Sequence, residues 1–441
     1  MRRAPDEIQL TTFFFDLSAC TKSEHRLFMY TSFLPARAPV ASGPAQMPHD
    51  ASELSIRRIA GAYRAKLGES PVWTEDGRLA FVDIVAKELL VVTAADAADA
   101  ADATPKRVRL PTTPGCLVRS KKGGLLVALT VDDAAPDQPG GRLCRVQLPP
   151  DGTNASGVAG GDVQDVRDVQ DVDPKTTWVC DVLNKNLHPA LDDPSTPRTV
   201  LNDGAVDARG RVWVGSKLLS TRAPKPGHRG QPPGAVFCCE SAFAFRDGAM
   251  TTVGSAQAVR EIGGVHTSNG LGWSPCGSVM YHADSPRRRV DAYDFDARSG
   301  ALSSPRVFCE IADGGVPDGL AVDAEGGVWV CVWDGGRVER WVPSQTSSVQ
   351  SQTDGASVTS GRTATRDRTL DLAAAVNVSR PTSCCFGEGA FAETLFVTSC
   401  AFDDTVEGHN AVDLARTEPN AGAVFAVDVG VRGAPTHAAA F

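Results

Sequence analysis

The chain has 441 residues, of which 42% are apolar and 22% charged, a composition typical of a globular protein. Its 53 acidic and 44 basic residues give a net charge of −9, which disfavours nucleic-acid binding because such binding needs a basic surface. The longest apolar run, near residues 125–131, is far shorter than the ~20 residues of a membrane-spanning helix. We therefore expect neither nucleic-acid nor membrane partners, and no protein partner is indicated.

The first 50 residues differ in composition from the rest and lack the apolar segment of a secretory signal. They predict a disordered N-terminal extension over residues 1–50, followed by one domain over 51–441. Low-complexity stretches occur at 95–103, 160–172 and 344–363. Because such stretches cannot bury a core, we expect surface insertions near 151–198 and 344–368.

The twelve cysteines form no Cys-x-x-Cys pair, which argues against a zinc knuckle or a thioredoxin-type site. We expect buried free thiols, as in proteins of a reducing compartment. Together with the missing secretory signal, this indicates a cytoplasmic location.

Four stretches of the chain align without gaps. They begin at Glu69, Asn202, Asn269 and Asp318 and read ESPVWTEDGRL, NDGAVDARGRV, NGLGWSPCGSV and DGLAVDAEGGV. Glycine stands eight residues after each of these anchor residues, and Leu or Val stands ten residues after. Each stretch therefore predicts an apolar strand, a turn in which glycine supplies a positive φ, and a second apolar strand.

Two looser copies of this pattern lie near residues 116–129 and 382–397, which brings the number of repeats to six. The closest repeats are separated by roughly 45–50 residues, the length of one propeller blade. High Gly and Pro contents also favour short strands over helices. The sequence therefore predicts an all-β fold, a six-bladed β-propeller with loop insertions.

The four anchor residues all carry side-chain oxygens. Because propeller repeats are related by rotation about a central axis, we expect these residues to converge at one mouth of the channel. Crowded carboxylates repel one another unless a proton or a cation is present. Two carboxylates with amide oxygens form a hard site that suits Ca²⁺, Mg²⁺ or Mn²⁺. Alternatively, the Asn-Gly and Asp-Gly pairs are ordinary turn dipeptides.

Five ordered motifs resemble those of the gluconolactonase, regucalcin and senescence-marker-protein family. They are LGESPVW, LNDGAVDARGRVWVGS, SNGLGWSPCGSVMYHADSPRRRVDAYDFD, VPDGLAVDAEGGVWVCVWDGGRVERW and PTSCCFGEGAFAETLFVTS. The resemblance extends over about residues 56–430, apart from the insertions. It implies a six-bladed propeller that hydrolyses sugar lactones with one divalent cation, of which Ca²⁺ is the first expectation and Zn²⁺, Mn²⁺ and Mg²⁺ are alternatives.

The resemblance also implies roles for individual residues. Glu69, Asn269 and Asp318 match the family's metal ligands. Asn202 matches a residue that contacts substrate beside the metal, and Asp203 matches its neighbour in the same motif. In the expected reaction the cation polarises the lactone carbonyl, water attacks, and Asp318 acts as the general base.

Two departures put the usual sugar substrate in question. The family has an arginine, which holds sugar hydroxyls, where this chain has Val200. Arg198 lies two residues earlier, ~7 Å along a regular strand and on the same face, and we consider it a substitute contact. If Arg198 does not take this role, we expect a more apolar substrate pocket than in the family. The segment HRGQPPGAVF also lacks a clear counterpart of a substrate-contacting glutamate of the family.

Other catalytic motifs are missing from the sequence. It has no G-x-S-x-G, no P-loop, no dinucleotide-binding G-x-G-x-x-G and no H-E-x-x-H. His266 and His282 flank the Asn269 motif, and we expect structural roles for both. The prediction is a metal-dependent lactonase acting on a small-molecule lactone. The alternatives are a non-catalytic calcium-binding regulatory protein and a hydrolase of non-sugar lactones or phosphotriesters.

Overall fold

The computed structural model describes residues 54–440, with gaps at 62, 94–103, 131–140, 149–169, 172–177, 184–198, 219–233, 241–242, 247–248, 253–256, 313, 345–363 and 402–416. The predicted extension over residues 1–50 and most of both predicted insertions lie outside these ranges, so those expectations stay predictions. In the described part of the chain, no helix is long and apolar enough to cross a membrane.

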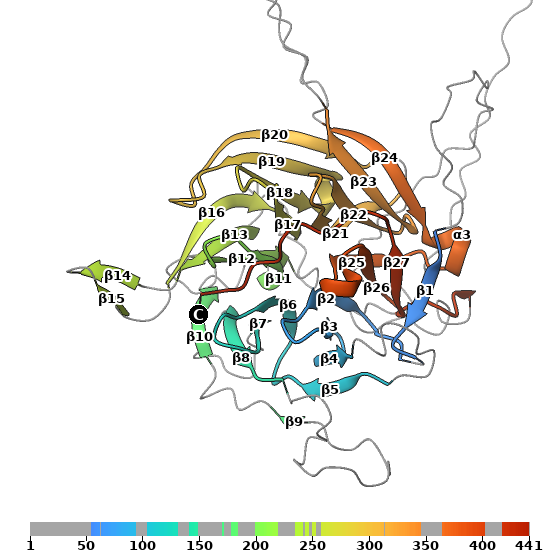
Figure 1. Ribbon diagram of the computed structural model, residues 1–441, viewed down its shortest axis with the longest axis horizontal. Helices are drawn as coiled ribbons and strands as arrows, with labels where there is room; N and C mark the ends of the chain where they lie inside the picture. Colours follow the sequence, from blue (N-terminus) through green and yellow to red (C-terminus); the bar gives the residue numbers. More distant parts are fainter. Residues whose placement is uncertain are drawn as a thin grey trace, which may run out of the picture. The chain divides into compact units, whose positions relative to one another are not determined.

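Six antiparallel sheets surround a central axis as the blades of a β-propeller (Figure 1). Blade 1 has β2 (Gly68–Trp73), β3 (Leu79–Asp83), β4 (Glu88–Val92) and β5 (Lys106–Arg109), with the short β9 (Gln170–Asp171) parallel to β5. Blade 2 has β6 (Pro114–Arg119), β7 (Leu125–Thr130), β8 (Gly141–Val146) and β10 (Trp178–Leu183). Blade 3 has β11 (Thr199–Val206), β12 (Val212–Leu218), β13 (Gly234–Glu240) and β16 (Gln257–Val265), and a separate hairpin is formed by β14 (Phe243–Arg246) and β15 (Ala249–Thr252).

Blade 4 has β17 (Ser268–Trp273), β18 (Val279–Asp284), β19 (Arg289–Phe295) and β20 (Leu302–Glu310). Blade 5 has β21 (Val316–Val322), β22 (Val328–Trp333), β23 (Arg337–Pro343) and β24 (Ala364–Asp371). Blade 6 has β25 (Pro381–Phe386), β26 (Thr394–Ser399), β27 (Val424–Asp428) and β1 (Ile56–Ile59). The short helices are α3 (Leu372–Val376), η2 (Ser285–Arg287) and η3 (Gly389–Phe391).

The ring is closed by strands from the two ends of the domain. β1, the first described strand, pairs with β27 and completes blade 6. The innermost strands β2, β6, β11, β17, β21 and β25 each contact the next one around the ring. The predicted six-bladed propeller is thereby confirmed. The predicted insertion ranges, however, overlap three strands, because β9, β10 and the start of β24 fall within them.

The hydrophobic core consists of six clusters, each between two neighbouring blades. Blades 3 and 4, for example, are joined by the edge-on contact of Trp213 with Trp273, whose ring centroids are 5.9 Å apart. Both faces of each blade therefore pack against another blade, which explains the nearly continuous apolar runs in β3, β7 and β22. Of the ten described cysteines eight are buried and free, as predicted, whereas Cys276 is exposed.

The turn after each innermost strand also follows the repeat. The glycines eight residues after the four anchors have positive φ values of 69–87°, as predicted: Gly77, Gly210, Gly277 and Gly326. In two blades an aspartate holds the turn. Asp323 accepts hydrogen bonds from the Gly327 N–H, Trp329 Nε1 and Arg340 Nε at 2.7–2.8 Å.

Asp207 has the same role in blade 3. It accepts hydrogen bonds from the Arg211 N–H, Arg211 Nε and Trp213 Nε1. The two aspartates begin the related sequences DARGRVW and DAEGGVW. In blades 3 and 5 the repeat therefore encodes a buried aspartate that holds the turn, as well as the turn itself.

Candidate functional site

Each innermost strand contains a β-bulge at the same level of the channel. In β11 the pairing with β12 shifts between Leu201 and Gly204, so that Asn202 and Asp203 together face one residue. Equivalent shifts occur in β2, β6, β17, β21 and β25. A bulge bends a strand and redirects its side chains, and bulges are common beside active sites. The first bulged residue of β11, β17 and β21 is the repeat anchor, and in β2 the anchor Glu69 directly precedes the bulge.

Glycines next to the anchors let the innermost strands approach closely. A Cβ atom on Gly319 would lie 2.1 Å from Ser383 Oγ of β25, and one on Gly270 would lie 2.4 Å from Leu320 N of β21. Neither position has room for a side chain. The pairs 269–270 and 318–319 therefore lie within strands, where the neighbouring backbone requires glycine. The turn-dipeptide alternative is wrong for these two pairs.

The amide side chains at this level belong to a hydrogen-bond chain that crosses three blades. Asn202 Nδ2 donates to Asn269 Oδ1 and to Ser268 O, both at 2.7 Å. Asn269 Nδ2 donates to Ser285 Oγ at 2.6 Å, and Ser285 Oγ donates to Pro317 O at 2.7 Å. Pro317 directly precedes Asp318. The chain therefore fixes both amides and ties them to the strand that carries the aspartate.

Three carboxyl groups lie within electrostatic range of one another. The side chains of Glu69, Asp203 and Asp318 are all buried, with exposed fractions of 5–9%. Burial first, and then the negative charges of Asp318 and Asp203, raise the pKa of Glu69 well above its ordinary value. Burial raises the pKa of Asp203 to about 6, although the Gly204 N–H and Lys217 act in the opposite direction. A proton or a cation would relieve this repulsion.

The donor set fits a hard divalent cation. Glu69 and Asp318 offer carboxylates, and Asn269 offers an amide oxygen whose second lone pair is left over after the bond from Asn202. Such all-oxygen sets suit Ca²⁺, Mg²⁺ or Mn²⁺. Among the residues that the structure describes, no three His, Cys, Asp or Glu side chains group closely enough to hold an ion by themselves. A cation site at this level would therefore need the amide oxygen of Asn269 as well as carboxylates.

The structure brings together five of the six predicted site residues, whereas Arg198 lies outside the described residues. The five are Glu69, Asn202, Asp203, Asn269 and Asp318. Val200 is buried and pairs with Lys217 of β12. Lys217, Ser268 and Ser285 are polar residues at this level that sequence reasoning missed. The signal for Lys217 is weak, because its place opposite Val200 depends on the bulge. Without the bulge it would lie opposite Leu201.

His282 is a buried structural residue beside this network, whereas His266 is exposed. The His282 ring Nε2 lies 3.0 Å from Ser268 Oγ. Burial first, and then the positive charge of Arg287, lower the pKa of His282 to about 3. The ring is therefore neutral at physiological pH and orients the serine that precedes Asn269.

This pKa shift predicts a loss of stability in acid. Unfolding restores the ordinary pKa of 6.5, so the unfolded chain binds a proton that the folded protein excludes below that pH. The contribution of His282 to the free energy of unfolding is fully present above pH 6.5. It falls as the pH drops, by ~2 kcal/mol at pH 5. His282→Gln should flatten the pH dependence of the urea unfolding midpoint between pH 5 and 7.5. His266→Gln is the matched control, and equal profiles for wild type and His282→Gln would contradict the prediction.

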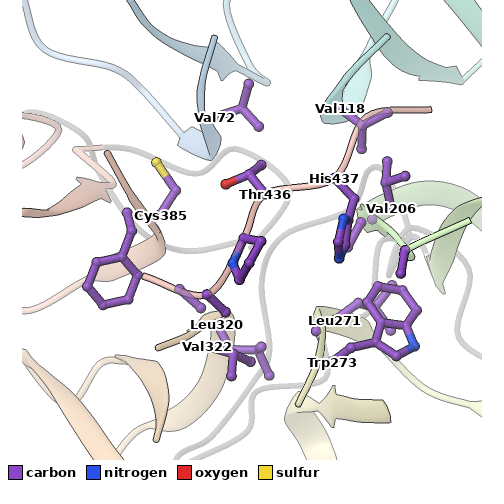
Figure 2. Close-up of a pocket in the computed structure, with 18 of the residues that line it drawn as sticks. Val72, Val118, Val206, Leu271, Trp273, Leu320, Val322, Cys385, Thr436 and His437 are labelled. Atoms are coloured by element: carbon purple, nitrogen blue, oxygen red, sulfur yellow. The ribbon is translucent and has the colours of Figure 1, made fainter. Parts of the chain in front are cut away.

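Beyond the bulges, the innermost strands enclose a pocket of about 310 Å³ (Figure 2). Ser70 and Asp203 lie at the border between this pocket and the carboxyl cluster, which is the group of Glu69, Asp203 and Asp318. The walls of the pocket are mainly apolar, with Val72, Val118 and Trp273 among them. Figure 2 shows the segment with Thr436 and His437 passing between these walls. The pocket is therefore the part of the channel nearest the blade turns.

The C-terminal segment crosses the channel at the turn end. The Ala434 N–H donates to Val322 O of blade 5 at 3.0 Å. Further along, the N–H groups of Ala439 and Ala440 donate to Arg119 O of blade 2 and Gly210 O at 2.8 and 2.9 Å. The segment thus crosses the end of the channel opposite the carboxyl groups of Glu69, Asp203 and Asp318.

Fold and site together define a class of protein: a six-bladed β-propeller with carboxyl and amide side chains gathered at one end of its channel. Residues 67–362 match the family described as SMP-30/Gluconolactonase/LRE-like region, which is more than half of the chain. The chain belongs to this family, which confirms the resemblance found in its motifs.

Known proteins agree with this assignment. Regucalcin of Danio rerio is 28% identical over 376 residues, covering 84% of this chain and 94% of its own length. A luciferin-regenerating enzyme has a similar structure, with a TM-score of 0.59, 20% identity and coverage of 88% of this chain and 100% of that chain. Regucalcin of Agrobacterium tumefaciens strain C58, described as a calcium-binding protein, has a TM-score of 0.53 and 19% identity, over 87% of this chain and 96% of its own. The two structural similarities support the fold alone.

Proposed function

We propose that this protein is a hydrolase that opens the ring of a small lactone with the help of one divalent cation. The observation that carries the proposal is the buried group of Glu69, Asn269 and Asp318, whose oxygens suit a hard cation and whose carboxyl groups repel without one. Family membership and the regucalcin relatives support the same function. Ca²⁺ is the first candidate, because one structural neighbour is described as calcium-binding.

The proposed mechanism assigns a role to each side chain. A divalent cation held by Glu69, Asn269 and Asp318 would supply Lewis acidity for the ester carbonyl and its developing negative charge. Asp318 accepts the proton of the attacking water as the general base and returns it to the ring oxygen as the acyl C–O bond breaks. Asn202, oriented by its bonds to Asn269 and Ser268, positions the substrate together with Asp203.

The substrate is proposed to be less hydroxylated than the usual sugar lactone. Val200 is buried and apolar at the level of the site, so it offers no hydrogen bond to a sugar hydroxyl. A simple aliphatic lactone has no hydroxyl group that would need a hydrogen-bond partner at this position. We also propose a cytoplasmic location, because the eight buried free thiols of the described part suit a reducing compartment.

Initial hydrolysis rates test the proposal. The protein is stripped of metal, restored with Ca²⁺, Mg²⁺, Mn²⁺ or Zn²⁺, and assayed on aldonolactones, simple aliphatic lactones and a phosphotriester. We expect chelation to lower the lactone rate at least ~100-fold and one of these cations to restore it. If folded protein binds an ion but hydrolyses no lactone, the lactonase proposal fails. Phosphotriester turnover would then support the altered hydrolase, and no turnover the calcium-binding regulatory protein.

A further inference from the structure

Lys217 is a cationic residue at the level of the carboxyl cluster with no role in the proposed mechanism. It is the sixth residue of β12 and pairs with Val200 of β11. It also forms an isolated bridge with Thr267, the residue just before β17. Lys217 therefore lies between blades 3 and 4, where both strands approach their bulged anchors.

Two other residues of β12, Trp213 and Gly215, show which side of the strand Lys217 is on. Trp213 packs against Trp273 of blade 4, and a Cβ atom on Gly215 would lie 1.9 Å from Ser268 Oγ. Because side chains alternate along a strand, Lys217 points to the same side as residues 213 and 215. This side of blade 3 faces blade 4, and Asn202 donates to Ser268 O between the same two blades.

The positive charge of Lys217 influences the pKa values of the carboxyl cluster. Asp318, Asp203 and Lys217 are the three charged side chains with the largest influence on the pKa of Glu69, and Lys217 alone of them lowers it. Lys217 also lowers the pKa of Asp203. When all three carboxyl groups are ionised, this lysine neutralises one of them, so the group retains two negative charges.

We propose that Lys217 tunes the charge selectivity of this site by weakening its preference for trivalent over divalent cations. This inference rests on the cation site of the proposed function. Two excess negative charges match one divalent ion. A trivalent ion of similar size is attracted more strongly by the carboxylates, but it is also repelled more strongly by the ammonium group, because Coulomb energy scales with the ion's charge.

Calorimetric titration of the metal-free protein with Ca²⁺ and with Tb³⁺ tests this role without reference to activity. Lys217→Met removes the charge but keeps an unbranched side chain of similar length. We expect the variant to bind Ca²⁺ about tenfold more tightly and Tb³⁺ about 30-fold more tightly, since the removed repulsion is half as large again for the trivalent ion. The rise in melting temperature on adding Ca²⁺ should increase in parallel.

Two controls separate charge from packing. Lys217→Arg keeps the charge and should bind both ions as the wild type does. Lys121→Met removes the same charge from an exposed turn at the opposite end of the propeller, next to the C-terminal segment, and should also change neither affinity. An equal gain for both ions in Lys217→Met, or a gain in Lys121→Met as well, would overturn the proposed role.

The outcomes also distinguish this inference from the proposed function. If the wild type binds Ca²⁺ but folded Lys217→Met has unchanged affinities, only the role of Lys217 fails. If the folded wild type binds none of the four divalent cations, the cation site itself fails, and the role of Lys217 fails with it.

Discussion

Asparagine in place of Asp318 is expected to lower kcat/KM for the best lactone substrate by about a thousandfold or more. The substitution keeps the size of a buried side chain but removes a negative charge from the cation site and the proposed general base. General-base catalysis alone contributes roughly 100- to 10,000-fold. The loss of one carboxylate from a hard-cation site adds to that effect.

The same variant separates the site from the fold. Because Asp318 raises the pKa of Glu69 by repulsion, the metal-free variant should be at least as stable as the metal-free wild type. Stabilisation by Ca²⁺ should be largely lost. Melting curves with and without Ca²⁺ measure both effects. Asp294→Asn, the same change at an exposed position of blade 4, is the matched control. Wild-type hydrolysis by Asp318→Asn would contradict its proposed role.

Asp323→Ala is expected to lower the free energy of unfolding by about 3–5 kcal/mol. Asp323 is fully buried and accepts bonds from Trp329 Nε1 and Arg340 Nε at 2.8 and 2.7 Å. Its removal leaves a buried guanidinium without its innermost carboxylate, although Glu325 and Asp367 still bind the outer nitrogens. Removing one partner of a buried ion pair costs more than the pair contributes, because the other charge stays buried.

Urea unfolding monitored by tryptophan fluorescence measures this loss. A second variant, Asp323→Ala with Arg340→Met, tests the cause. It should recover part of the lost stability, because the buried charge is gone and an apolar side chain fills its place. Asp296→Ala, at an exposed turn of blade 4, should change stability little. A loss in Asp323→Ala no larger than in Asp296→Ala would contradict the prediction.

Much of the fold follows from local chemistry in the sequence. Each turn glycine needs a positive φ, and each flanking strand needs apolar residues on both faces because blades pack on both sides. These requirements recur around the ring, so the four gapless copies of the repeat predict the strands and turns, and the two looser copies complete the number of blades. The repeat also predicts that its polar anchors share one level, because equivalent residues of a propeller are related by rotation.

The bulge is the feature that the repeat does not reveal. It inserts one residue between Leu201 and Gly204 and reverses which side chains share a face beyond that point. A regular ladder counted from the turn would place Lys217 opposite Leu201. The bulge places it opposite Val200 instead. The effect of its charge on Glu69 and Asp203 is likewise visible only in the folded structure.

The sequence alone determined the blades, their turns and the polar anchors at Glu69, Asn202, Asn269 and Asp318, because these depend on short stretches that repeat the same local geometry. The tertiary structure alone decided three further features: the closure of blade 6 by β1, the crossing of the channel by residues 434–440, and the place of Lys217 beside the carboxyl cluster. Each joins segments far apart in the chain or depends on strand register. Contacts of this kind leave no periodic pattern in a sequence, because each occurs once and forms only when the whole ring is assembled.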